Sequence, residues 1–250
     1  MRMTWSARAG VAGFALIVTL GTALADSSRE ARASDARVAH SQVAQEAPRS
    51  SRWPDTPVAR LETLALLQTL NADLLSNDSA TLTLDRWCEA HKMAAPAKIV
   101  AERVHDTDKE PTAEVRQLLG VGPAEPVRYR HVRLHCGTHL FSEADNWYVP
   151  ARLTPDMNKV LDTSDTPFGR AVQDLHFRRR TLAAKLLWSP LPQGWEMARV
   201  FPQANQGPLE LPSAIIQHRA VLSLPDGTPF SALVETYTGE VLDFPPPPLP

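Results

Sequence analysis

The sequence predicts an α+β fold with a mostly antiparallel sheet, and three observations carry this prediction. Leucines recur at helical spacing in the first folded segment, apolar and polar residues alternate over 127–136, and turn residues at 225–228 separate two strand-like segments. Helices therefore come first and in the middle, and strands follow one another through short turns. This order differs from the repeated βαβ units of a parallel sheet.

The helices are predicted from capping residues and from periodicity. Thr-Pro pairs at 56–57, 154–155 and 166–167 place a capping hydroxyl before a proline at the first helical position. After the first pair, the leucine spacing predicts a helix over 57–75, and a second helix is predicted over 82–91. Short helices are expected after the other two pairs.

The rest of the folded part is predicted to form strands. A turn at 225–228 joins the last two strands as a hairpin, and the proline-containing stretch 189–212 is expected to be a long loop. The predicted strands are 98–104, 127–136, a segment containing 147–149, 178–188, 214–224 and 230–241.

The first 25 residues are typical of an export signal. Arg2 and Arg8 are the only charged residues among them, an apolar stretch covers 9–25, and small residues stand at Ala23 and Ala25, as signal peptidase requires. An uncleaved anchor helix is the alternative, although about 17 apolar residues is at the short limit for spanning a bilayer. We expect a signal peptide at 1–25, an exported, periplasmic protein, and no membrane span after cleavage.

One folded domain is expected between two irregular ends. Residues 26–55 are rich in Ser, Ala, Arg, Glu and Gln, which is typical of a flexible linker. Residues 245–250 form a proline-rich tail that can only be extended. The domain is therefore predicted over 56–244, and we expect it to be a monomer.

Composition excludes some classes of protein. The net charge of −2, from 26 basic and 28 acidic residues, lacks the basic excess of a nucleic-acid-binding protein, so no nucleic-acid partner is expected. Two cysteines exclude a disulfide framework. Cys88 and Cys136 could form one disulfide in an oxidising compartment, or each could be a plain thiol on a buried apolar face.

The histidines do not predict a metal site. His131, His135 and His139 are spaced by four, but the alternation around them indicates a strand, on which the first two are about 13 Å apart. One zinc ion cannot bridge that distance. We expect a solvated strand face and no metal.

Three other features could line a ligand site. Residues 142–150 crowd Glu, Asp, Asn, Trp and Tyr before a proline, either around a small-molecule pocket or as a strand whose aromatic residues pack in the core. The basic run 178–180 is interpreted as a solvated strand edge, with an anionic ligand as the alternative. Glu235 lies in an apolar strand, where it either faces water or meets an arginine or a ligand hydroxyl.

Several short motifs follow one another along 64–238. In this order they resemble bacterial chorismate pyruvate-lyase and its wider superfamily, which includes ligand-sensing domains of certain transcription regulators. The Thr-Pro-hydrophobic-Gly-Arg piece is the most specific of them. The motifs are Asp78-Ser79, Tyr129-Arg130-His131-Val132, Val149-Pro150, Asp165-Thr166-Pro167-Phe168-Gly169-Arg170 and Leu233-Val234-Glu235-Thr236-Tyr237.

The resemblance implies a fold and a set of site residues. The family has a six-stranded antiparallel sheet flanked by helices, with the ligand held under helical flaps. By resemblance, Arg130 would pair with the ligand carboxylate and Glu235 would bind its hydroxyl, as the catalytic residues. Ala80 and Phe168 would contact the ligand, and Asn146 stands where the family has a flap arginine.

The resemblance also implies a function. The lyase eliminates pyruvate from chorismate, leaves 4-hydroxybenzoate, and needs neither metal nor cofactor. The loss of the flap arginine argues against turnover. The predicted export also argues against it, because chorismate is made in the cytoplasm. We therefore expect an exported chorismate lyase-like protein that binds a small anionic or aromatic carboxylate without turnover. An active, cofactor-free lyase and a structural role with a filled pocket are the alternatives.

Overall fold

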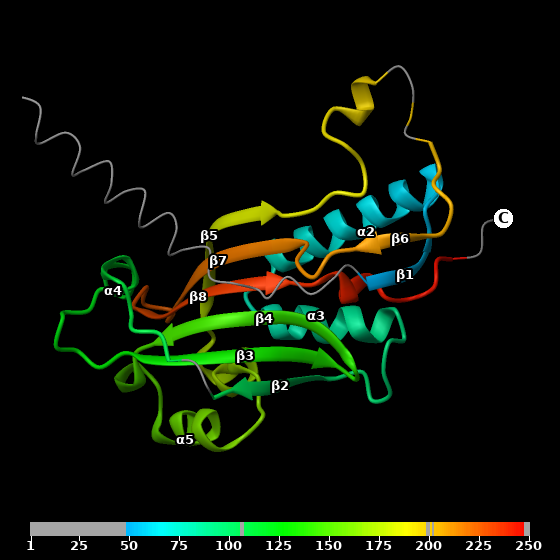
Figure 1. Cartoon of the computed structure of the whole chain (residues 1–250). Coiled ribbons are helices and arrows are strands. Elements are labelled where there is room, and N and C mark those ends of the chain that lie inside the picture. The colour runs from blue at the N-terminus through cyan, green and yellow to red at the C-terminus, as the bar shows by residue number, and fades with distance from the viewer. Residues whose placement is uncertain (1–48, 106–107, 199–200, 202, 248–250) are drawn as a thin grey trace, which may run out of the picture. The chain divides into compact units, whose positions relative to one another are not determined.

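The computed structural model describes residues 49–105, 108–198, 201 and 203–247 (Figure 1). The predicted signal peptide, the first part of the predicted linker and the last residues of the tail lie outside these ranges and stay predictions. Within the described ranges, no helix has the length and apolar character needed to cross a bilayer.

A six-stranded antiparallel sheet forms the centre of the domain, in the order β2-β3-β4-β8-β7-β5 (Figure 1). The predicted α+β class is confirmed, and so is the sheet that the resemblance implied. The strands are β2 (Ile99–Val104), β3 (Arg128–Cys136), β4 (His139–Tyr148), β5 (Arg178–Leu186), β7 (Ile216–Ser223) and β8 (Pro229–Tyr237).

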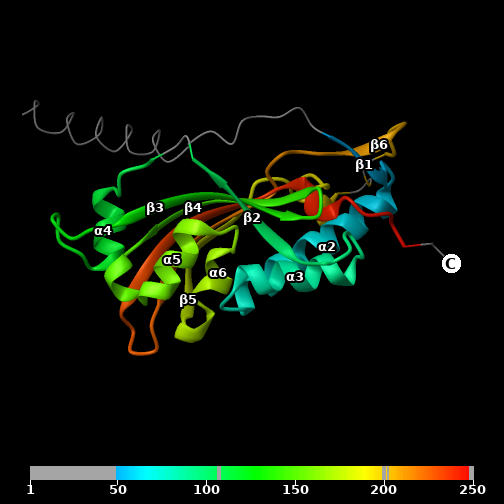
Figure 2. The ribbon, with the colours of Figure 1, turned by 90° about the horizontal axis from the view of Figure 1, so that it is seen from below.

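On one side of the sheet lie helices α2 (Pro57–Ser76), α3 (Ala80–Ala90), α5 (Pro155–Thr163) and α6 (Phe168–Ala171), as Figure 2 shows. Apolar residues of α2 and α3 pack with β2, β3 and β4 in the largest core, and those of α5 and α6 pack with β7 and β8 in a second core. A fifth helix, α4 (Ala113–Leu119), packs on the opposite face, against Trp147, Val221 and Ala232.

Two of the three Thr-Pro pairs start helices as predicted. Thr56 and Thr154 each accept a hydrogen bond from the backbone N–H three residues on, and the proline that follows each is the first helical residue. The third pair differs: Pro167 precedes α6, and the Thr166 hydroxyl accepts a hydrogen bond from Ser164 instead of capping the helix.

Sequence reasoning missed α4 and made one strand too long. Thr112 caps α4 by accepting from the backbone N–H of Val115, and Gly120 ends it at a φ of 61°, the left-handed conformation that favours glycine. The strand predicted over 230–241 ends at Tyr237, and a 3₁₀ turn follows at Gly239–Leu242. A side chain on Gly239 would lie 2.6 Å from a backbone carbonyl oxygen, so this turn requires glycine.

A second, two-stranded sheet extends the domain beyond the predicted boundaries. Strand β1 (Arg49–Pro54) pairs antiparallel with β6 (Pro208–Leu211), so the end of the predicted linker and the end of the predicted loop 189–212 are strands. Trp53 explains the pairing, because its ring is fully buried and its Nε1 donates to the carbonyl of Leu242 at 2.8 Å. Burial of one large aromatic residue outweighs the polar composition around it.

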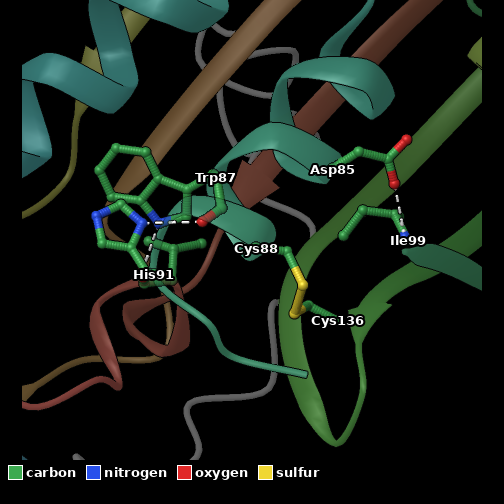
Figure 3. The surroundings of a disulfide bond; sticks show 7 residues. Asp85, Trp87, Cys88, His91, Ile99 and Cys136 are labelled. Atoms are coloured by element: carbon green, nitrogen blue, oxygen red, sulfur yellow. Dashed lines mark hydrogen bonds between the residues drawn. A yellow bond between two sulfur atoms is a disulfide. The ribbon is translucent and has the colours of Figure 1, made fainter. Parts of the chain in front are cut away.

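Of the two alternatives for the cysteines, the structure has the disulfide. Cys88 of α3 and Cys136 at the end of β3 are both fully buried and are bonded to each other, with their Cα atoms 6.1 Å apart (Figure 3). Asp85, one turn earlier on α3, accepts a hydrogen bond from the backbone N–H of Ile99 on β2 at 2.7 Å. Helix α3 is therefore held to two neighbouring strands.

Candidate functional site

All five residues that the resemblance assigned to a site line one cavity. It lies between the helix-covered face of the sheet, the start of α3 and the start of α6, and it has a volume of about 40 Å³. The residues are Ala80, Arg130, Asn146, Phe168 and Glu235.

The sheet register places the floor of this cavity. Arg130 of β3 lies directly opposite Asn146 of β4, and Ala144 of β4 lies opposite Glu235 of β8. Since side chains on a strand alternate between faces, these four residues point to the same side, toward the helices. The small side chain of Ala144 leaves space between the arginine and the glutamate.

Arg130 is a buried cation with unused hydrogen-bond donors. It is 3% exposed, and its Nη2 donates to the carbonyl of Thr166 at 3.1 Å. Its Nε and Nη1 have no hydrogen-bond partner among the described residues. Burial, and then the charge of Arg103, lower the pKa of Arg130 to about 10, so it is still protonated at neutral pH. Buried donors of this kind are normally satisfied.

Glu235 meets an arginine, as one alternative expected, but the arginine is Arg179. The Nη2 of Arg179 lies 2.5 Å from Oε2 of Glu235, and the hydroxyl of Tyr237 donates to the same oxygen at 3.0 Å. The side chain of Arg179 is 3% exposed, so the interpretation of run 178–180 as a solvated edge is wrong for its central residue. Burial raises the pKa of Tyr237 well above its usual value.

A second buried polar residue, His218, was missed in the sequence. It lies on β7 opposite Glu235 and is fully buried. Its Nε2 is 2.9 Å from Oδ1 of Asn71 on α2, and its ring packs edge-on against Tyr237. Burial lowers the pKa of His218. Its place in an alternating apolar strand was the one available signal, and that signal equally fits a solvated histidine.

The loop between α2 and α3 closes one end of the cavity. Asp78 in this loop accepts hydrogen bonds from the backbone N–H of Arg179 at 2.8 Å and from the guanidinium of Arg178 at 3.2 Å. Ser79 then caps α3 by accepting from the backbone N–H of Leu82. The first turn of α3, which includes Ala80, is thus fixed over the sheet.

Helix α6 approaches α3 closely over the same cavity. A Cβ atom added to Gly169 would lie 3.0 Å from Oγ of Ser79 and 3.1 Å from Oγ1 of Thr81. Next to Gly169, Phe168 forms a wall of the cavity, and its ring centroid is 5.4 Å from that of Tyr148. The two helix starts therefore form the roof that the resemblance described as flaps.

The side chain of Asn146 is fixed by a hydrogen bond from the neighbouring strand β8. It is 5% exposed, and its Oδ1 accepts a hydrogen bond of 2.6 Å from the hydroxyl of Ser231. This contact fixes the amide oxygen, and Arg130 lies directly opposite Asn146 across the strand pair. The amide carries no charge, whereas the resemblance implied an arginine at this position.

A larger cavity lies on the other side of Arg130. It has a volume of about 460 Å³, it opens at the corner where β2 ends beside β3, and it is mostly polar. Arg130 lines both cavities. Other residues around the larger one include Arg103, Lys109, Arg128, Tyr129 and Asp162.

The histidines of β3 and β4 lie beside different carboxylates. His131 is 2.8 Å from Glu143, His135 is 3.0 Å from Glu102, and His139 is 3.3 Å from Asp243. In the part of the chain that the structure describes, no group of three or more His, Cys, Asp or Glu residues is placed to hold a metal ion.

One curated relative shows the family of this chain. The uncharacterized protein y4mC of Sinorhizobium fredii (strain NBRC 101917 / NGR234) is 60% identical over 206 residues, which cover 82% of this chain and 87% of that protein. The chain belongs to the family of y4mC. No protein-family model matches the sequence. The relative's name states no activity, so membership of this family brings none with it.

Solved structures with a similar fold are much more distant. PhnF from Mycobacterium smegmatis is 14% identical, with 85% of this chain and 96% of that chain covered and a TM-score of 0.43. The effector domain of PhnF is 16% identical, with 62% of this chain and 88% of that chain covered and a TM-score of 0.40. A GntR-family transcriptional regulator from Enterococcus faecalis V583 is 13% identical, with 59% of this chain and 99% of that chain covered and a TM-score of 0.36.

These findings correct the expected function. The similar structures are of regulators and an effector domain, so the prediction of a chorismate lyase-like function, with or without turnover, is wrong. The predicted export stays a prediction. The resemblance stated from the motifs holds in part, because it included the ligand-sensing domains of transcription regulators. At these identities and TM-scores, no ligand and no activity of these proteins is transferred to the chain.

Proposed function

We propose that the described domain binds a small anionic molecule at Arg130. Arg130 carries the proposal, because it is a 3% exposed guanidinium with two nitrogens that lack a partner among the described residues. Leaving a buried charge and its donors unpaired is unfavourable. A carboxylate or another oxyanion that accepts from either nitrogen would supply both a hydrogen-bond acceptor and the missing counter-charge.

The other donors around the cavity favour the same ligand charge. Nε of Arg179 also lacks a partner among the described residues. The first N–H groups of a helix have no acceptor within the helix, and Ala80 is the first residue of α3. The acidic residue of the cavity floor, Glu235, is already neutralised by Arg179. A cavity that offers many donors and few free acceptors suits an anion.

The ionisable side chains beside the inner cavity are engaged with other protein groups. Its described lining contains two carboxylates, those of Asp78 and Glu235, and Asp78 accepts hydrogen bonds from Arg178 and Arg179. Glu235 is engaged by Arg179 and Tyr237, and Tyr237 has a raised pKa. These groups can hold a ligand.

Direct binding measurements with the full chain test this proposal. Thermal unfolding is followed with acetate, benzoate, succinate, phosphate and sulfate, and dissociation constants are measured by calorimetry. A ligand at one hundred times its Kd stabilises the protein by about 2.7 kcal/mol. We expect at least one anion to bind and R130M to lose that binding.

A matched variant controls for the loss of a positive charge. Arg133 lies on the same strand but on the opposite face, where its side chain is 43% exposed beside Glu143. R133M should therefore bind as the native protein does. If no anion binds, or if R130M binds as tightly as R133M, the proposal is wrong and a structural role with a filled pocket is favoured.

A further inference from the structure

A second arginine stands beside Arg130 on the same face of the sheet. Arg103 of β2 pairs with Val132 of β3, so it is the diagonal neighbour of Arg130 across the strand pair. Diagonal neighbours of this kind lie roughly 7 to 8 Å apart, within reach of long side chains. Both arginines therefore project toward the same volume above the edge of the sheet.

Both guanidiniums are oriented by backbone carbonyls of one short segment. Nη1 of Arg103 donates to the carbonyl of Asp162 at 2.6 Å, and Nη2 of Arg130 donates to the carbonyl of Thr166 at 3.1 Å. Neither forms an ion pair with a carboxylate of the described residues. Arg128, two residues before Arg130, does so: its Nη1 lies 2.8 Å from the carboxylate of Asp162.

The repulsion between the two arginines is only partly offset. After burial, the charge of Arg103 is the largest cause of the lowered pKa of Arg130. Tyr148, Asp165 and Asp162 act in the opposite direction, but they do not restore the usual value. Two like charges that are fixed close together and lack a bonded counter-ion favour the binding of an anion between them.

Space for a ligand is present at the same place. Arg103 and Arg130 both line the cavity of about 460 Å³, which is within the usual range for small-molecule sites, roughly 300 to 1,000 Å³. The inner cavity of about 40 Å³ holds little more than water. Arg130 lies at the junction of the two, so a ligand that reaches it has its body in the outer cavity.

We propose that Arg103 and Arg130 together hold one doubly charged oxyanion group of the ligand, with the rest of the ligand in the outer cavity. This inference rests on the proposed anion site at Arg130 and narrows its ligand class from anions in general to dianions. Each guanidinium offers a planar fork of N–H donors, and the two forks approach from neighbouring strands. A monoanion would neutralise one of the two cations and leave the other without a counter-ion.

Sulfate and inorganic phosphate at pH 8 are the dianionic probes, and acetate is the monoanionic probe. Affinities are measured by calorimetry on the full chain at constant ionic strength, because screening alone would otherwise differ between the salts. We expect sulfate and phosphate to bind the native protein at least about tenfold more tightly than acetate. R103M should lose about tenfold in affinity for the dianions and change less than about twofold for acetate.

Two further variants separate charge from geometry and from folding. R103K keeps the charge without the planar fork and should recover part of the dianion affinity, whereas R133M should behave as the native protein does. If R103M weakens acetate and sulfate by the same factor, or if native protein binds them equally, the paired site is wrong and the anion site at Arg130 stands. If no anion binds the native protein, both proposals fail.

Discussion

Arg179 on β5 reaches past β7 to Glu235 on β8, and its Nη2 lies 2.5 Å from Oε2 of the glutamate. Both side chains are at least 90% buried. The pair and Arg130 line the same inner cavity, and Glu235 is neutralised there by Arg179. A ligand at Arg130 therefore meets a cation that has no ion-pair partner among the described residues.

Breaking the Arg179–Glu235 pair should strongly destabilise the domain. R179M leaves a buried carboxylate without its cation, and such a change usually costs about 3–5 kcal/mol. R178M, one residue earlier on the same strand, removes an ion pair whose arginine is 80% exposed, and it should cost less than about 1 kcal/mol. Urea unfolding of both variants checks this, and equal midpoints for R178M and R179M would contradict it.

The disulfide should stabilise the folded protein, because it closes a loop of the chain and so restricts the unfolded state. Cys88 and Cys136 are separated by 48 residues, and a cross-link of that span typically stabilises by about 2–4 kcal/mol. We expect C88A/C136A to lower the urea midpoint, and a reducing agent to do the same to the native protein. Intact mass before and after reduction verifies the bond. An unchanged midpoint in both experiments is the result that would exclude a stabilising disulfide.

The sequence was enough to predict every α-helix of the described ranges except α4 and most strands of the sheet, because local signals set them. Thr56 and Thr154 cap helices as expected, and alternation gave β3 the correct inward face. What failed depends on contacts distant in sequence. Trp53 draws β1 into the domain through the carbonyl of Leu242, and a local reading of a polar segment cannot foresee a partner 189 residues away.

The same limit applies to the candidate site. The five residues taken from the resemblance line one cavity, and the burial pattern of β3 places Arg130 on its inward face. The partner of Glu235 could not be derived, because Arg179 is 56 residues away and in a basic run that resembles a solvated edge. Strand order decides that contact, and strand order is a property of the whole sheet.

The close approach of α6 to α3 should make Gly169 sensitive to a single methyl group. G169A places a Cβ atom 3.0 Å from Oγ of Ser79, so the Ser79 and Thr81 hydroxyls must shift by a few tenths of an ångström, which disturbs the cap of α3. We expect a loss of about 1–3 kcal/mol, as for overpacked cores, together with weaker anion binding. G122A is the matched control, because its Cβ would meet nothing within 4 Å. Unfolding midpoints and calorimetry check both variants. A G169A protein with native stability and native anion affinity would contradict the prediction.

His218 should make stability fall as the solution becomes mildly acidic. Burial lowers its pKa in the folded state, Arg179 acts in the same direction, and Glu235 opposes them. As the pH falls, His218 is therefore protonated first in the unfolded chain, near pH 6.5. The contribution of neutral His218 to the unfolding free energy is complete above that pH and is lost as the pH falls toward the folded pKa.

H218Q isolates this contribution, because glutamine can keep a hydrogen bond to Asn71 without titrating. Unfolding free energies from urea at pH 7.5 and 5.5 should differ by roughly 1 kcal/mol more in the native protein than in H218Q. Equal pH dependence in native protein and H218Q would show that another group carries it, since no other residue differs between the two proteins.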